Sequence, residues 1–460
     1  MQDSFYENLV LLLTLGLFGA ALLALPISRR TAWLFLVAGI PWTIEISEWR
    51  TFTLSLPTDA FAGLIGSAVI VYLLFSPRSI SSVWQAGIMR WIILYLLWMG
   101  IGVLFSADTL ISFKFWLSQS AYFLAFSVGS FLWMKGESSP TQAYWRVISL
   151  SGILVMGICV LRHLNLGGTR AMVNEAISPF MREHTVYGAY SAWFFTGSVV
   201  AAFLRPGLLS ILGVGVSGAA LLLSYSRGGW LSALAALSLW LIMEQLRRLS
   251  PIGRFAIMSG LSLTLLASGI FLLTYNPEIL QLQAKQKIGE VGEHFVSSFD
   301  VQKNPSNMER INRWFSALQM IQERPIVGFG ANTFSQEYSA YQRSITRTSI
   351  SVEMGEIGGA HSEYLTAASE MGLPGLILLL GIYLSTVGIG LGYLWRENNA
   401  TKRWEVALII LPLLSYYLHG FINNFMDHGH MAALVYLHWG ILAALQRESV
   451  PSPYAKVPRV

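Results

Sequence analysis

Long apolar runs recur from one end of the chain to the other, and within each run the apolar residues are continuous rather than alternating. A run of about 20 residues can cross the core of a bilayer as a helix, because each helical residue rises about 1.5 Å. Helices and closed barrels satisfy every backbone polar group in lipid, and the strands of a barrel would alternate. The sequence therefore predicts an all-α, polytopic membrane helical bundle.

The pattern predicts about thirteen transmembrane helices. They lie at 7–26, 31–46, 59–76, 87–105, 113–134, 146–163, 185–204, 207–223, 229–246, 254–274, 373–395, 404–421 and 430–446. The second run is short and contains Pro41 and Glu45, so twelve helices is the alternative. One long hydrophilic segment interrupts the series, and long ordered loops are usually functional. We expect a single integral membrane domain over residues 1–460 with a helical insertion at 275–360.

The composition agrees with a lipid environment. Apolar residues make up 54% of the chain and charged residues 12%, whereas soluble domains carry about 25% charged residues. The single cysteine, Cys159, excludes an intramolecular disulfide and a cysteine-based metal site. The net charge of +5 does not predict a nucleic-acid partner, because multispanning proteins need basic residues at helix ends for orientation.

The distribution of basic residues predicts the orientation. With the N-terminus outside, sixteen of the 30 Lys and Arg residues fall in segments on the cytoplasmic side. Apart from the long insertion, the outer side holds Arg50, Lys114, Arg162, Arg170, Arg182 and Arg227. The insertion then faces outward. Because Met1 to Glu7 is acidic and no cleavage site is evident, we expect the first run to be a retained helix.

The insertion is expected to contain three amphipathic helices, at 277–299, 306–324 and 332–344. On the second, Arg310, Arg313 and Trp314 stand at i, i+3 and i+4, so they share one face. His361 follows two glycines and an alanine and opens the next membrane helix at the water boundary.

Five short segments carry a specific resemblance. They are Ser226-Arg-Gly-Gly-Trp230, Arg310 to Trp314, Arg324-Pro-Ile-Val-Gly-Phe-Gly330, Gly359-Ala-His-Ser-Glu-Tyr-Leu365 and Glu370-Met-Gly-Leu-Pro-Gly375. In this order they resemble the O-antigen ligase and polymerase superfamily, over roughly residues 180 to 430. The resemblance implies a GT-C-like glycosyltransferase of the bacterial inner membrane. Such an enzyme takes a glycan from undecaprenyl pyrophosphate and transfers it to an acceptor sugar on the periplasmic face.

By this resemblance, Arg227, the helix arginine at 310 or 313, and His361 correspond to the family's functional residues. Ligases often have Asn directly after the motif His, whereas this chain has Ser362 and then Glu363. That departure favours a polymerase that extends a lipid-linked chain over a ligase that transfers the glycan to lipid A core. The implied partners are the lipid-linked donor, the acceptor, the bilayer, and a chain-length regulator or other envelope proteins.

The chemistry of the residues leads to the same assignment. A pyrophosphate leaving group needs preorganised cations, and guanidinium groups bind phosphate oxygens in bidentate fashion. Histidine, with a pKa near ~6.5, suits the acceptance of a proton from an attacking hydroxyl. The five Asp residues include no Asp-x-Asp pair. We therefore expect a metal-independent mechanism without a cofactor, in which arginine replaces the metal cation and His361 is the base.

Further polar residues are candidates for supporting this site. Arg182 and His184 could contact phosphate or acceptor, and Trp314, Tyr364, Glu370 and Asp427 could support the reacting groups. The cluster His419, Asn423, Asn424, Asp427, His428 and His430 has metal-ligand residue types without a recognisable ligand spacing. We favour an Asp427 that pairs with a nearby cation or His.

The same residues are also compatible with purely structural roles and with two different functions. Arg227 could anchor a helix by snorkelling, Arg310 and Arg313 could form a solvated helix face, and His361 could only begin a helix. A transporter or flippase would place ionisable residues at the bilayer midplane and would often show repeated halves. A non-catalytic scaffold would use the insertion as a docking surface.

Overall fold

The structure is a computed structural model of the chain. It describes residues 28–49, 52–134, 140–250, 305–342 and 359–448, with a few single positions before 28 and at 252–253. The predicted helices at 7–26, 254–274 and 277–299 lie outside this part of the chain.

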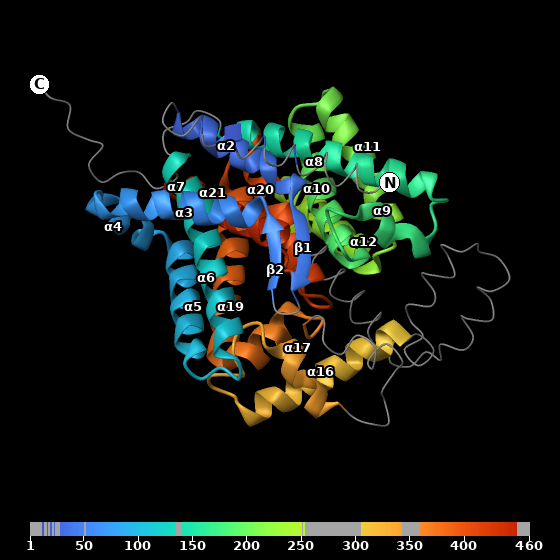
Figure 1. The fold of residues 1–460 in the computed structure, drawn as a ribbon. Helices are drawn as coiled ribbons and strands as arrows, with labels where there is room; N and C mark the ends of the chain where they lie inside the picture. The colour runs from blue at the N-terminus through green and yellow to red at the C-terminus, as the bar shows by residue number, and fades with distance from the viewer. Residues whose placement is uncertain are drawn as a thin grey trace, which may run out of the picture.

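The described residues form a helical bundle, so the all-α prediction is confirmed (Figure 1). The helices of its membrane part are α2 (Arg29–Gly39), α3 (Thr58–Leu74), α4 (Pro77–Gln85), α5 (Gly87–Val103), α6 (Thr109–Tyr122), α7 (Gly129–Trp133), α8 (Pro140–Asn165), α9 (Val173–Ile177), α10 (His184–Leu204), α11 (Leu208–Leu223), α12 (Arg227–Arg248), α19 (Glu363–Arg396), α20 (Ala400–His419) and α21 (Gly429–Glu448). A π-helical segment, Phe123–Val128, joins α6 to α7. By length and hydropathy, four of the described helices could cross a membrane alone, and a fifth span exists if the bent pair α3 and α4 counts as one.

The predicted second span, 31–46, is wrong beyond Gly39. Helix α2 is only 11 residues long, and a 3-10 turn (Ile40–Trp42) with proline in its first turn ends it. The chain then forms an antiparallel hairpin of β1 (Ile44–Trp49) and β2 (Phe52–Leu56), with Glu45 opposite Ser55. Proline removes a helical hydrogen bond and β-branched residues favour strands, so the interrupted run folds as a hairpin.

The described part of the insertion confirms one helix and corrects another. Helix α16 (Pro305–Glu323) matches the prediction at 306–324. The predicted helix at 332–344 is wrong, because that stretch contains only the short α17 (Phe334–Glu337) and a 3-10 turn (Tyr338–Tyr341). Asn332 has a φ of +63°, which interrupts a helix at its start. Figure 1 shows α16 and α17 together at one end of the bundle.

A break in α19 attaches the insertion to the bundle. Gly372 has a non-helical φ of 69° and Pro374 follows it, so carbonyl groups lose their helical partners. The amides of Phe329 and Gly330 bond the carbonyls of Ser369 and Glu370 at 3.1 and 2.8 Å. A Cβ atom at Gly372 would overlap the carbonyl of Ile326. The two motifs 324–330 and 370–375 are thus the two sides of one backbone contact.

Helices α10, α20 and α21 form the centre of the bundle. Trp193 of α10, Tyr416 of α20 and Trp439 of α21 are each almost fully buried. Helix α20 also packs on α12 and α19. Since α12 begins at Arg227 and α19 follows His361, this packing brings two distant motifs to the same end of the bundle.

Candidate active site

The motif at 226–230 starts helix α12 and places Arg227 in its first turn. Ser226 is the N-cap, and its hydroxyl accepts a hydrogen bond from the amide of Gly229 at 3.3 Å. A side chain at Gly228 would overlap His419 of α20. A side chain at Gly229 would lie 2.8 Å from the carbonyl of Gly188 in α10. The two glycines therefore let α12 approach both neighbours closely.

The positive charges of three arginines from separate segments repel one another. Arg310 of α16 is part-buried, and burial, Arg227 and Arg170 lower its pKa. Arg170 stands in a 3-10 turn (Arg170–Met172) after two glycines, and Tyr225 donates a hydrogen bond to the carbonyl of Gly168 at 2.8 Å. Like charges that depress one another's pKa favour an anion between them. Such an arrangement suits a pyrophosphate.

Arg170 is a member of this cluster that the sequence does not single out. Its position on the outer side is predicted, but no motif surrounds it. A signal is present in the adjoining glycines, Gly167 and Gly168, which both have positive φ and mark a tight turn. The turn packs against the residue preceding the Ser226 cap, and that contact depends on the tertiary fold.

Arg313 has a different environment from Arg310. Its side chain is 3% exposed and pairs with Glu309 of the same helix at 2.9 Å. It also donates to the carbonyl of Gly359 at 2.8 Å and lies over the ring of Tyr338. These contacts hold α16 against the segment that leads to His361.

His361 does not open a helix as predicted, because α19 begins at Glu363 with Ser362 as its N-cap. His361 lies in the left-handed region with a φ of +50°. The indole of Trp314 donates to its carbonyl at 3.3 Å. A non-glycine residue in this conformation is uncommon and must be held by its surroundings. The structure thus fixes His361 between α16 and α19.

The imidazole of His361 is hydrogen-bonded by Asn423. The amide nitrogen of Asn423 also lies 3.1 Å from Nε2 of His419. Burial, Arg313 and Arg310 lower the pKa of His361 to about 3. His361 is therefore neutral at pH 7, but it is a weaker base than a histidine with an ordinary pKa.

Two carboxylates on one face of α19 each hold a neighbouring loop. Glu363 accepts hydrogen bonds from the amides of Phe425 and Met426 at 2.6 and 3.2 Å. Two turns later, Glu370 accepts from the amides of Asn332 and Phe334 at 2.7 and 3.0 Å. Glu363, which departs from the ligase pattern, therefore has a structural partner in the last outer loop. Glu370 supports the 332–334 turn.

The remaining predicted residues lie around this centre. Arg182 donates to the backbone carbonyl of Glu45 at 3.0 Å and lies 3.9 Å from its carboxylate, so it contacts strand β1. His184 begins α10, and its amide bonds Asn174. The hydroxyl of Tyr364 donates to the carbonyl of Tyr417 at 3.0 Å, so Tyr364 packs against α20.

The His-rich cluster of the last outer loop divides into two parts. His419 and Asn423 adjoin His361, whereas His428 lies 3.0 Å from Glu45 and 3.8 Å from Asp427. Burial opposes protonation, but Glu45 and Asp427 raise the pKa of His428 to about 10. Asp427 does pair with a histidine, as expected from the sequence. In the described part of the chain, no group of three or more His, Cys, Asp or Glu side chains is arranged for a metal ion.

A comparison with protein families identifies the central part of the chain. Residues 212–380 match the family model described as O-antigen ligase, which supports the suspected superfamily. The match includes the five motif segments, and it is narrower than the predicted range of 180 to 430. No curated protein matches the chain.

Proposed function

From the match of residues 212–380 to the O-antigen ligase family model, we propose that the chain transfers a glycan from undecaprenyl pyrophosphate to an acceptor sugar. The observation that carries the proposal is that Arg170 and Arg227 are near enough to Arg310 to lower its pKa, and that Arg310 in turn lowers the pKa of His361. A cluster of cations beside a neutral imidazole supports acid–base chemistry next to a phosphorylated leaving group.

The three arginines would bind the pyrophosphate and stabilise the charge that develops on it. When the bond between the anomeric carbon and the phosphate oxygen breaks, the oxygen keeps the electron pair. Removal of one preorganised donor of this kind typically costs about 10²–10³ in kcat. Arginine can supply this stabilisation without a metal, so the proposal stays metal-independent and without a cofactor.

His361 would accept the proton of the acceptor hydroxyl as its oxygen bonds the anomeric carbon. The hydrogen bond from Asn423 would orient the imidazole for that transfer. The cations that lower the pKa of His361 would be offset by the negative charge of the bound donor. Donor binding would therefore raise the pKa of the base, while burial, the larger cause of its low value, would still act on it.

The reaction would take place on the periplasmic face of the bacterial inner membrane. We retain the preference for a polymerase over a ligase that uses lipid A core, because of Ser362 and Glu363. Glu363 holds the loop at 425–426. This difference from the ligase pattern therefore affects the backbone that surrounds the site. A chain-length regulator or another envelope protein remains a proposed partner.

The test uses the purified full chain in nanodiscs with labelled undecaprenyl-pyrophosphate glycan. Wild type should produce longer lipid-linked chains or, with a lipid A core acceptor, a labelled core, and the product distinguishes polymerase from ligase. His361→Ala and Arg227→Ala should lose at least about 100-fold in kcat at matched folding. Arg248→Ala is the matched control, because Arg248 is exposed at the opposite end of α12. Equal rates for wild type and His361→Ala would refute the assignment of His361 as the base.

A pH profile separates a base from a merely structural histidine. Because the pKa of His361 is lowered in the free protein, the acid limb of kcat/KM should lie well below about pH 6. The acid limb of kcat reports the complex and should lie at higher pH. Acid limbs of kcat and kcat/KM at the same pH would count against a base whose pKa depends on the charges of the arginines.

A further inference from the structure

A pocket adjoins the candidate active site on the side of α19 that carries Glu363 and Glu370. It is a hollow that is partly open to solvent. Gly359 and Glu363, which flank His361 in the chain, line it, whereas Arg170, Arg227 and Arg310 do not. The pocket therefore adjoins the segment that carries the proposed base, and none of the three arginines of the proposed pyrophosphate site lines it.

The walls of the pocket are fixed by hydrogen bonds within the protein. Glu363 holds one loop through the amides of Phe425 and Met426, and Glu370 holds another through the amides of Asn332 and Phe334. Glu363 holds its loop through Oε1, and Glu370 holds its loop through both carboxylate oxygens. The loops in turn present other side chains to the pocket, so those side chains are preorganised for binding.

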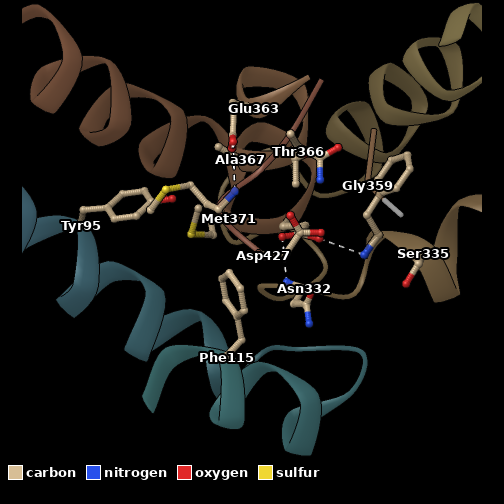
Figure 2. Close-up of a pocket in the computed structure, with 14 residues that line it drawn as sticks. Tyr95, Phe115, Asn332, Ser335, Gly359, Glu363, Thr366, Ala367, Met371 and Asp427 are labelled. Atoms are coloured by element: carbon tan, nitrogen blue, oxygen red, sulfur yellow. Dashed lines mark hydrogen bonds between the residues drawn. The ribbon is translucent and has the colours of Figure 1, made fainter. Parts of the chain in front are cut away.

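The lining combines hydrogen-bonding side chains with aromatic rings. Hydrogen-bonding groups come from Asn332, Ser335, Thr366, Asn424 and Asp427, and rings come from Tyr95, Phe115 and Phe334. Figure 2 shows Tyr95 and Met371 on one side, Ser335 on the other, and Asp427 with Asn332 between them. Amide and carboxylate groups placed among apolar walls suit a small polyhydroxylated ligand.

The acidic residues of the pocket favour uncharged or cationic ligands over anionic ones. Among the described residues that line it there is no Lys or Arg, whereas Glu363, Glu370 and Asp427 are acidic. Asp427 lies 3.8 Å from His428, and His428 is held by Glu45. A phosphate or carboxylate brought into this pocket would meet acidic side chains and no Lys or Arg in its described lining.

We propose that this pocket is the acceptor-sugar subsite, and that it takes an uncharged or amino sugar and rejects an anionic one. The inference rests on the proposed function, because it assigns the second substrate of the same reaction. Asp427 and Asn424 bind acceptor hydroxyl groups here, while the donor pyrophosphate occupies the arginine cluster. The sugar hydroxyl that reacts is then held next to His361.

The experiment varies an unlabelled acceptor glycan at a fixed concentration of labelled undecaprenyl-pyrophosphate donor, with the full chain in nanodiscs. Asp427→Asn and Asn424→Ala should each raise the acceptor KM about tenfold, as expected for the loss of one hydrogen bond to a polar group. The donor KM should stay close to that of wild type. Asn398→Ala, an exposed position in the loop between α19 and α20, is the matched control, and thermal unfolding verifies each variant.

A second measurement tests the charge. The same acceptor with its primary hydroxyl groups oxidised to carboxylates should react at least about tenfold more slowly than the neutral acceptor with wild type. Asp427→Lys should reduce that discrimination. An unchanged acceptor KM in both pocket variants, or a raised donor KM, would overturn the subsite while leaving the proposed function intact. Absence of any transfer by wild type would overturn the proposed function, and this inference with it.

Discussion

At the scale of residues, two arginines one turn apart on α16 have different tasks. Arg313 is buried against Glu309 and bonds the backbone beside His361. The positive charges of Arg227 and Arg170 act on Arg310 and lower its pKa. A guanidinium group in a buried ion pair is held by its carboxylate partner. A guanidinium group that is repelled by neighbouring cations is stabilised when an anion binds between them. We therefore assign pyrophosphate binding to Arg310 and support to Arg313.

The substitution Arg310→Ala should lower kcat/KM at least about 100-fold with little change in thermal stability. Arg313→Ala should lower the free energy of unfolding by about 3 kcal/mol, because it removes the buried ion pair with Glu309. The double variant Glu309→Ala/Arg313→Ala should recover part of that stability. Transfer assays and thermal unfolding in nanodiscs measure both effects. A stable but inactive Arg313→Ala would reverse the two assignments.

At the scale of elements, the glycine-containing motifs act through backbone contact. Gly328, Gly330 and Gly372 all have positive φ, where residues with a side chain are strained. The 326–330 segment satisfies the carbonyls that the break in α19 exposes, and next to it the amide of Leu373 bonds the carbonyl of Pro325 at 2.8 Å. These motifs thereby set the position of α16 relative to α19, which in turn positions His361.

The substitution Gly372→Ala should destabilise the protein by at least about 2 kcal/mol, through backbone strain and overlap with the carbonyl of Ile326. Gly388→Ala in the same helix is the control, because a Cβ there meets nothing within 4 Å. It should be neutral or slightly stabilising. Membrane expression and thermal unfolding compare the two. Equal stability of both variants would contradict the proposed contact.

At the scale of the whole molecule, the distribution of charge agrees with two chemically different ends. Arg403 pairs with Glu244 at 3.2 Å, and Arg247 donates to the carbonyl of Glu397 at 2.8 Å. These residues join the ends of α12, α19 and α20 that are opposite Arg227 and His361. The predicted orientation places the first group in the cytoplasm and the second in the periplasm.

Cysteine labelling tests this orientation. In a Cys159→Ala background, Ser339→Cys in the insertion should react with a membrane-impermeant maleimide added from the periplasmic side. Asn398→Cys should react only after the inner membrane is opened. Both positions are exposed, and Cys159 is buried, so its loss is a mild change. The reverse labelling pattern would place the candidate site in the cytoplasm and would contradict the proposed use of a periplasmic donor.

The order of residues along the chain is sufficient to predict the bundle, most of its helices and the superfamily. Hydropathy and motif spacing are local properties, and the helices at 59–76, 87–105 and 185–204 accordingly match α3, α5 and α10 closely. The two wrong helices lie where local breakers, Pro41 and the turn at Asn332, outweigh the periodic pattern.

Which polar residues work together is established only by the packing of the helices. Arg170 joins Arg227 and Arg310, Glu45 holds His428, and Glu363 holds the loop at 425–426. Each of these groups combines segments that are far apart in the chain, and the energy of a charge depends on its burial and its neighbours in space. Sequence spacing does not contain that information, because helix packing sets those distances.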